Sequence, residues 1–318
     1  MQVHTDLTKL PTFNKAVITI GTFDGVHTGH LKILEQLKHE AERIGGESVI
    51  ITFDPHPRMI LPGRADDIKL LNTLKEKIKL LQTKSIDHLV VVPFTELFSQ
   101  QSAEQYIKDF IVNLFHPHTI IIGYDHHFGR GRKGNYLLLE LYQEEYNYRV
   151  NEIPEHVINK VTISSTRIRE ALLSSDIKTA NKFLGYSYSF EGTVVSGDKI
   201  GRTLGYPTAN LEVLDPDKLL PGNGIYAIET LVPDFDNIAE PAHRTILKGM
   251  MSIGVRPTIG GNKKTIEVHI LDFTENLYGK EIRVFLKFFL RPEIKFNTLE
   301  ELKTAIAQDE IKSRHLLR

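Results

Sequence analysis

The stretch GTFDGVHTGH, residues 21–30, decides how the first half of the chain folds. It follows a run rich in β-branched residues and leads into residues 30–43, where apolar side chains recur at helical spacing. Continuous apolar runs indicate strands covered on both faces, and strands separated by helices indicate right-handed crossovers. We therefore expect an α/β domain with a parallel sheet, whose strands lie at residues 16–20, 48–53, 88–92 and 119–122.

The pattern of apolar residues changes after Gly185. Apolar and polar residues now alternate in short segments between Gly- and Pro-rich turns, which indicates antiparallel sheet and favours a small barrel. A last helix begins at Thr298, where Thr298 and Glu301 match a capping box. We expect one domain at residues 1–185, ending in two helices, and a second at residues 186–318. The expected helices span residues 166–173 and 177–184, and the expected barrel strands span residues 190–195, 225–232, 266–273 and 282–290.

The composition excludes several classes of function. The chain has no cysteine, which excludes disulfides, thiolate catalysis and cysteine-ligated metals. Its formal net charge is -1, so long-range attraction to nucleic acid or to an anionic membrane is not expected. The N-terminal residues lack the pattern of a signal peptide, and no apolar run approaches the length of a membrane span. We expect a cytoplasmic protein without a nucleic acid or membrane partner.

The loop at residues 21–30 has the chemistry of a phosphate site. Ligands bind at the carboxyl ends of parallel strands, and a helix N-terminus there offers N–H groups to phosphate. Gly21 lets the backbone approach a ligand closely, and His27 and His30 can donate to phosphate oxygens. The two histidines could instead cap the helix or bind a metal. The loop does not match the Walker pattern.

The H-x-G-H pattern in this loop resembles the nucleotidylyltransferase superfamily. With FDPHP at residues 53–57, the fuller string is similar to the FMN adenylyltransferase half of bacterial bifunctional riboflavin kinase/FAD synthetases. The resemblance implies a Rossmann-like nucleotidylyltransferase fold. It also implies a site for ATP and FMN that includes Gly21, Phe23, Asp24, His27 and His30.

Two later segments extend this resemblance. ISSTRIR, residues 163–169, opens a helix with hydroxyls and arginines, and GYDHHFGRGRKG, residues 123–134, follows a strand. The family resemblance implies that Ser164, Ser165, Thr166 and Arg169 contact phosphates and that Asp125 lies near the reacting groups. Alternatively, Ser165 or Thr166 is only an N-cap, and the basic residues of the second segment are a solvated charge run. That segment also matches G-x-G-x-x-G, but it does not follow the first strand as a dinucleotide fingerprint does.

The string GDKIGRTLGYPTAN, residues 197–210, carries the chemistry of the second half. Thr208 and Asn210 alternate with Ala209, so both face one side of an extended segment, where oxygen ligands suit Mg²⁺. On their own they could be turn formers. The segment resembles the riboflavin kinase family, which assigns Thr208 and Asn210 to the metal–nucleotide site. The resemblance also implies an ATP and flavin site formed by Gly197, Lys199, Gly201, Arg202, Thr203, Pro207 and Arg291.

Glu267 is the candidate base. It lies in TIEVHILDF, where Ile266, Val268 and Ile270 share one face of a strand and Glu267 points the other way. A carboxylate that faces the interior or mouth of a barrel is costly unless it has a function or a partner. In the kinase family the matching glutamate removes the proton of the riboflavin 5′-hydroxyl. Alternatively, Glu267 is an exposed strand carboxylate.

The two resemblances together imply a bifunctional enzyme. With ATP as co-substrate and Mg²⁺ as cofactor, the second domain would convert riboflavin to FMN and the first would convert FMN to FAD. Three rivals share the expected fold: a monofunctional riboflavin kinase, a flavin- or nucleotide-binding regulator without turnover, and another nucleotidylyltransferase fused to an unrelated barrel. Fold alone does not separate them.

Overall fold

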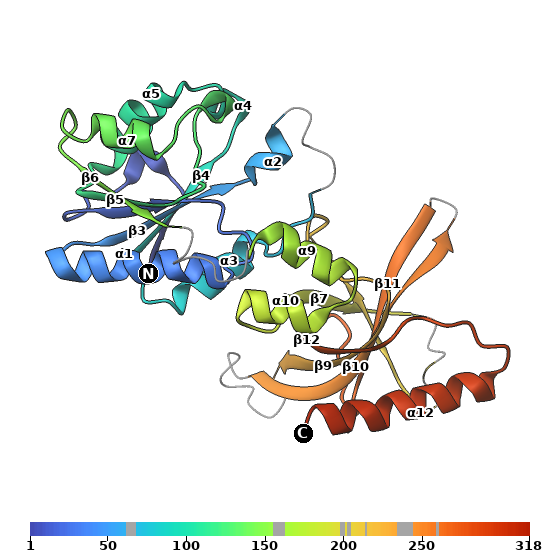
Figure 1. Cartoon of the computed structure of the whole chain (residues 1–318). Coiled ribbons are helices and arrows are strands. Elements are labelled where there is room, and N and C mark those ends of the chain that lie inside the picture. The colour runs from blue at the N-terminus through green and yellow to red at the C-terminus, as the bar shows by residue number, and fades with distance from the viewer. Residues whose placement is uncertain are drawn as a thin grey trace. The chain divides into compact units, whose positions relative to one another are not determined.

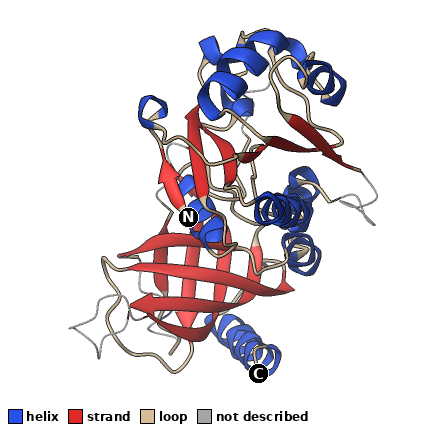
Figure 2. Ribbon diagram, turned by 90° about the vertical axis from the view of Figure 1, so that its left-hand side faces the viewer, coloured by secondary structure: helices blue, strands red, loops and turns tan. Residues whose placement is uncertain are grey.

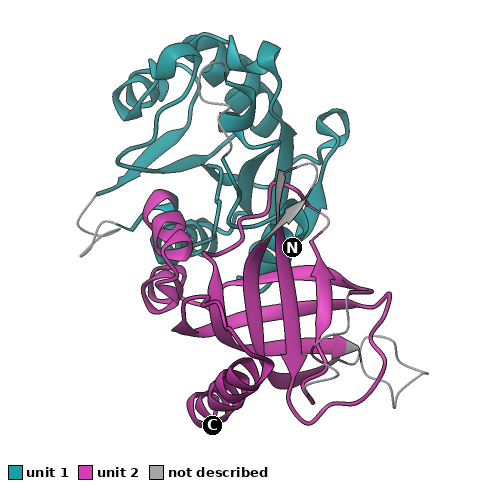
Figure 3. Ribbon diagram, turned by 90° about the vertical axis from the view of Figure 1, so that its right-hand side faces the viewer, with its two compact units in different colours: residues 1–165 teal, residues 166–318 magenta. Residues whose placement is uncertain are grey.

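The computed structural model describes residues 1–61, 68–154, 163–197, 201, 205–213, 215–233, 244–258 and 261–318 (Figure 1). The chain divides into two compact units, residues 1–165 and 166–318 (Figure 3). The expected domain boundary, at residue 185, lies further along the chain than this division. The two helices at residues 165–184 fall almost entirely in the second unit.

The first unit is an α/β fold. Its elements are β1 Gln2–His4, η1 Leu7–Lys9, β2 Val17–Ile20, α1 Thr28–Ile44, β3 Ser48–Asp54, α2 Pro57–Ile60, α3 Leu74–Gln82, β4 His88–Pro93, α4 Glu96–Ser99, α5 Ala103–Gln105, the π-helix η2 Tyr106–Val112, α6 Asn113–Phe115, β5 Thr119–Gly123, η3 Arg130–Arg132, α7 Tyr136–Tyr142 and β6 Arg149–Ile153.

Six strands of this unit form one parallel sheet in the order β1-β4-β3-β2-β5-β6. The expected parallel α/β architecture is therefore confirmed. Strands β3 and β4 follow one another on one side of β2, and β5 and β6 follow one another on its other side. The strand order thus reverses between β2 and β5, and in open α/β sheets this is where ligands bind.

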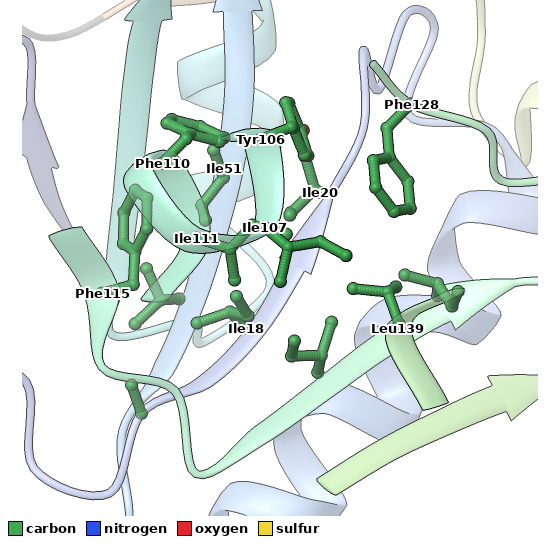
Figure 4. Packing of buried hydrophobic residues seen from close by; sticks show 14 of the residues in the cluster. Ile18, Ile20, Ile51, Tyr106, Ile107, Phe110, Ile111, Phe115, Phe128 and Leu139 are labelled. Atoms are coloured by element: carbon green, nitrogen blue, oxygen red, sulfur yellow. The ribbon is translucent and has the colours of Figure 1, made fainter. Parts of the chain in front are cut away.

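Apolar side chains cover both faces of the sheet, as the continuous apolar runs predict. One cluster packs Ile18, Ile51 and other strand residues against Tyr106, Phe110 and the rest of η2 (Figure 4). A second cluster packs the opposite face against Leu34, Leu37 and other residues of α1 and α3.

The loop after β5 is anchored in the first of these clusters by Phe128. Its ring is buried and stacks on Tyr106 with centroids 5.0 Å apart. Phe128 and Gly134 exchange backbone hydrogen bonds, which closes the loop. A Cβ at Gly134 would lie 2.3 Å from the Phe128 ring, so only glycine fits there. The anchor leaves Arg130, Arg132 and Lys133 exposed.

The second unit is a closed antiparallel barrel in the order β10-β11-β8-β7-β12-β9, with helix α12 packed against β9, β10 and β12 (Figure 2). This confirms the predicted barrel with its C-terminal helix. Helix α10 packs against β12, where the Asn181 side chain donates to the Leu286 carbonyl at 2.8 Å. The elements are α9 Ser165–Leu173, whose first residue ends the first unit, α10 Ile177–Leu184, β7 Ser189–Val195, β8 Ala209–Glu212, β9 Gly224–Pro233, β10 Arg244–Thr258, β11 Gly261–Ile270, β12 Glu281–Arg291 and α12 Leu299–Leu316.

Two details of this unit differ from the sequence-based expectation. The sequence patterns did not predict strands β8 and β10. Glycines at 249 and 254 interrupt the pattern of β10, although each lies where a Cβ would clash with a neighbour. At α12, Thr298 caps Glu301 N–H, but the Glu301 carboxylate accepts from Asn297 N–H rather than from Thr298, so half of the predicted capping box forms.

We expect Gly134→Ala to destabilise the first unit by about 1–3 kcal/mol, because the added methyl must displace a ring held in a packed core. Urea unfolding measures the change. Lys133→Ala, at an exposed neighbour, is the control and should change stability by less than about 0.5 kcal/mol. Equal stability of the two variants would contradict the anchoring role of Phe128.

Candidate functional site

The loop at residues 21–27 and the loop at residues 124–134 follow neighbouring strands. β2 pairs with β5 in parallel register, Val17 opposite Thr119. Both loops therefore leave the same edge of the sheet, at the point where the strand order reverses. This edge is the candidate ligand site of the first unit.

His27 is the N-cap of α1. Its Nδ1 accepts a hydrogen bond from the His30 backbone N–H at 3.3 Å. An accepting Nδ1 carries no proton, so the neutral ring holds its proton on Nε2 and can donate it to a ligand. The rings of His27 and His30 stack with centroids 3.6 Å apart. The helix-cap alternative is therefore correct for Nδ1, and it leaves the Nε2–H donor outside the cap.

Both histidines are neutral near pH 7. Burial lowers the pKa of His27 from 6.5 to about 4. Burial first, and then His27 and the Lys77 ammonium, lower the pKa of His30 well below its ordinary value. Nδ1 of His30 is buried and has no hydrogen-bond partner among the described residues. The pair therefore offers hydrogen-bond donors rather than positive charges.

Phe23 and Asp24 shape this loop from inside. The Phe23 ring is buried 5.1 Å from the His30 ring. Asp24 is also buried, and its Oδ1 accepts from the backbone N–H groups of Leu71 and Asn72 at 3.0 and 3.3 Å. Phe23 and Val26 have positive φ angles of 46° and 36°, which side chains with a Cβ rarely adopt. The loop is thus held in a strained conformation.

Of the other residues predicted for this site, Ser165 contacts the loop, and Thr166 and Arg169 belong to the second unit. Ser165 joins the loop, because its hydroxyl donates to the Asp24 carbonyl at 2.9 Å. It is the first residue of α9, so neither Ser165 nor Thr166 precedes that helix. Asp125 is exposed in the loop after β5. Ser164 lies just before α9, and Thr166 and Arg169 belong to the second unit.

Lys77 was not predicted from the sequence. This side chain is 6% exposed, and its Nζ donates to the Thr22 carbonyl at 2.8 Å and to Thr52 Oγ1 at 3.3 Å. A pattern could have indicated it, since Lys77 occupies the apolar stripe of α3 with Leu74, Ile78 and Leu81. A lysine on the buried face of a helix needs an explanation.

In the barrel, strand register brings the predicted kinase residues together. Glu267 on β11 lies opposite Asn210 on β8 and opposite Ser252 on β10. Thr208 donates from Oγ1 to Glu267 Oε2 at 3.3 Å. Ile266, Val268 and Ile270 are buried, so Glu267 points to the outer face of the barrel wall and not into its interior.

The glycines of the preceding segment lie against these side chains. A Cβ at Gly197 would lie 2.0 Å from Asn210 Nδ2, and a Cβ at Gly201 would lie 3.2 Å from Thr208 Oγ1. Tyr206 N–H donates to the Gly201 carbonyl, and His269 Nδ1 donates to the Pro207 carbonyl at 2.7 Å. Gly197 and Gly201 thus border the candidate site.

Of the remaining residues predicted for the kinase site, the structure describes the contacts of Arg291. Arg291 donates from Nε and Nη2 to the buried Asp309 carboxylate of α12, with the Nη2 contact at 2.7 Å. Much of its donor capacity is thus used to hold α12 on the barrel. Lys199, Arg202 and Thr203 lie outside the described residues. Over the described part of the chain, no cluster of three or more His, Asp or Glu side chains could hold a metal ion.

Two protein-family models together match almost the whole chain. The FAD synthetase family model matches residues 10–167, and the riboflavin kinase family model matches residues 184–317. The bifunctional riboflavin kinase/FMN adenylyltransferase of Escherichia coli K12 is 35% identical over 94% of this chain and 91% of its own length. The chain belongs to this family. The relative from Buchnera aphidicola subsp. Schizaphis graminum is 38% identical over 93% of this chain and 92% of its own.

A solved structure agrees with the architecture of the family. A crystal structure from Streptococcus pneumoniae, described as a macrolide-efflux protein, is 28% identical and covers 98% of both chains with a TM-score of 0.87. That description concerns the streptococcal protein. In the described part of this chain, every helix is too short or too polar to cross a membrane.

We expect His27→Asn to flatten the pH dependence of stability, because asparagine keeps an N-cap oxygen and removes the titrating ring. The pKa of His27 is about 4 in the folded state and 6.5 ordinarily, so the unfolded chain binds the proton first as the pH falls. The wild type therefore loses stability from about pH 6.5 down to 4, by roughly 2 kcal/mol at pH 5. Urea unfolding at pH 7 and pH 5 measures this loss.

The difference between the two proteins measures the contribution of His27 together with its coupling to His30, because His27 is one of the groups that lower the pKa of His30. Burial also lowers the pKa of His126 to about 4, but that contribution is common to both proteins and cancels in the difference. An identical loss of stability between pH 7 and pH 5 in wild type and His27→Asn would contradict the buried neutral state of His27.

Proposed function

We propose that the barrel phosphorylates riboflavin to FMN at Glu267, Thr208 and Asn210, and that the α/β unit adenylylates FMN to FAD at the loop 21–30. The observation that carries this proposal is that both candidate sites occur in one chain. The candidate base lies beside the candidate nucleotide residues in the barrel, and His27 caps α1 where the strand order of the sheet reverses.

In the kinase step, Glu267 orients the riboflavin 5′-hydroxyl and accepts its proton as the oxygen attacks the γ-phosphorus of ATP. The bond from that phosphorus to the ADP oxygen breaks, so catalysis is mainly positioning and charge neutralisation. Thr208 and Asn210 would hold Mg²⁺, because Thr208 Oγ1 contacts the Glu267 carboxylate, Asn210 lies opposite Glu267 on β8, and Mg²⁺ prefers oxygen ligands. When bound, Mg²⁺ would neutralise phosphate charge.

In the adenylyltransferase step, a phosphate oxygen of FMN attacks the α-phosphorus of a second ATP and pyrophosphate leaves. A phosphate nucleophile is already anionic, so this site needs no strong base. The N-terminus of α1 and the Nε2–H donor of His27 would bind phosphate oxygens. His30, Arg169 and the hydroxyls of Ser164 and Thr166 would complete the site and stabilise the leaving pyrophosphate.

The proposed functional domains differ from the compact units. We assign residues 1–185 to adenylyl transfer, because α9 carries Ser165, Thr166 and Arg169, and residues 186–318 to the kinase. Helices α9 and α10 are assigned to the first domain by this chemistry, although they are part of the compact unit that contains the barrel. We also propose that the enzyme acts in the cytoplasm, which suits a chain without cysteine.

Substitutions at the two sites should separate the two steps. We expect Glu267→Gln to slow FMN formation from riboflavin by about 10²–10⁴-fold, because the general base is lost, with FAD formation from supplied FMN unchanged. We expect His27→Ala to slow only FAD formation. Chromatography of flavins over time, with riboflavin or FMN as the sole flavin, measures both steps.

Each variant is the control for the other, because each retains one reaction. FMN without FAD from the wild type would overturn the bifunctional assignment and leave a monofunctional kinase. No product from either flavin, with binding intact, would favour a regulator.

Metal dependence should follow the residues assigned to Mg²⁺. We expect EDTA to stop FMN formation and added Mg²⁺ to restore it. Asn210→Ala should raise the Mg²⁺ concentration that gives half-maximal kinase rate, because one oxygen ligand is lost. Ser252→Ala, which changes the other cross-strand neighbour of Glu267, is the matched control. The same Mg²⁺ requirement in both variants would contradict the role of Asn210.

A further inference from the structure

Lys77 is a buried cation that the proposed mechanism does not use. Its Nζ has two acceptors, the Thr22 carbonyl and Thr52 Oγ1, and no described carboxylate lies within ion-pair distance of it. Removing an ammonium from water costs several kcal/mol. An apolar side chain at this position of α3 would avoid that cost, so the presence of lysine points to a function.

The contacts of Lys77 are made to the candidate ligand loop. The Thr22 carbonyl accepts from Lys77 Nζ at 2.8 Å and from Thr52 Oγ1 at 3.1 Å. One residue later the chain enters the strained turn with positive φ at Phe23, Gly25 and Val26. Strained backbone persists only where the surrounding structure holds it, and it concentrates at functional sites.

A single segment supplies the contacts that hold this turn from the α3 side. Leu71 and Asn72 donate to the Asp24 carboxylate, and Lys77 donates to Thr22 from the first turn of α3. The turn ends at His27, whose ring caps α1. The helix cap at His27 thus lies five residues after the Lys77 contact at Thr22.

Lys77 also contributes charge. The groups that act on His30 are His27 and Lys77, and those that act on Lys77 are Asp24 and Asp54. Burial lowers the pKa of Lys77, and the two carboxylates oppose that shift. Burial is the main cause of the lowered pKa of His30, and His27 and the Lys77 ammonium lower that pKa further.

We propose that Lys77 is a positioning residue for FMN adenylylation: by binding the Thr22 carbonyl it holds the 21–27 turn in the conformation that presents His27 and the N-terminus of α1 to the ATP phosphates. The inference rests on the proposed function of this loop. It gives Lys77 no contact with substrate and no part in the kinase reaction of the barrel.

The test compares Lys77→Met with Lys75→Met, the same substitution at an exposed position of the same helix. We expect Lys77→Met to lower kcat/KM for FAD formation by about 10–100-fold, as small misplacements of binding groups do. Riboflavin phosphorylation by the same molecules should not change. Lys77→Arg, which keeps a cation and N–H donors, should recover part of the loss.

The pH profile distinguishes positioning from packing. Without the ammonium, the pKa of His30 should rise, so the acid limb of FAD formation should move toward neutral pH in Lys77→Met and not in Lys75→Met. Should Lys77→Met fail to fold, Thr52→Val removes one acceptor of the ammonium and the second donor to the Thr22 carbonyl at nearly constant volume. It should slow FAD formation about 3–10-fold without affecting the kinase.

The activity of the wild type distinguishes a failure of the role of Lys77 from a failure of the proposed function. A wild type that forms FAD, with Lys77→Met and Lys75→Met alike in rate and pH profile or with an unaffected Thr52→Val where Lys77→Met does not fold, overturns the role of Lys77 alone. A wild type that forms no FAD overturns the proposed function, whatever the variants do.

Discussion

The buried carboxylate of Asp24 is the contact on which the ligand loop of the first unit depends. It joins the turn after β2 to backbone N–H groups at Leu71 and Asn72, 47 and 48 residues later in the chain. Loss of this acceptor would leave buried donors unsatisfied, at a cost of about 1–3 kcal/mol each. A local motif, H-x-G-H, thus obtains its conformation from a distant segment, and the same segment carries Lys77.

In the barrel, the comparable constraint is strand register. Because successive side chains alternate between the two faces, a slip of one residue in β11 would turn Glu267 inward and expose Ile266 and Val268. The buried apolar face therefore fixes which side the carboxylate occupies. Asn210 and Ser252 lie opposite it on the neighbouring strands, so packing on the inner face organises the chemistry on the outer face.

The sequence predicts the architecture well, because hydrophobic periodicity is local, and its motifs lie at both candidate sites. It predicts less about what each side chain does. Phe23 and Asp24 belong to the motif, yet both side chains are buried and shape the loop. Lys77 has no motif, and only its place on an apolar stripe distinguishes it from a surface lysine. Strand β10 was missed because its glycines have a tertiary cause, the close approach of His269 and Glu293.

Because the two stacked histidines are neutral, the positive charge of the candidate phosphate site must come from other groups. Burial lowers the pKa of both, so near pH 7 they contribute N–H dipoles, as does the N-terminus of α1. A triphosphate carries several negative charges, which dipoles alone do not neutralise. Under the proposed function, that charge falls to groups that stay cationic, namely Mg²⁺, Arg169 and the basic loop after β5. Because neither histidine titrates near neutral pH, these two residues keep the same charge across the physiological range.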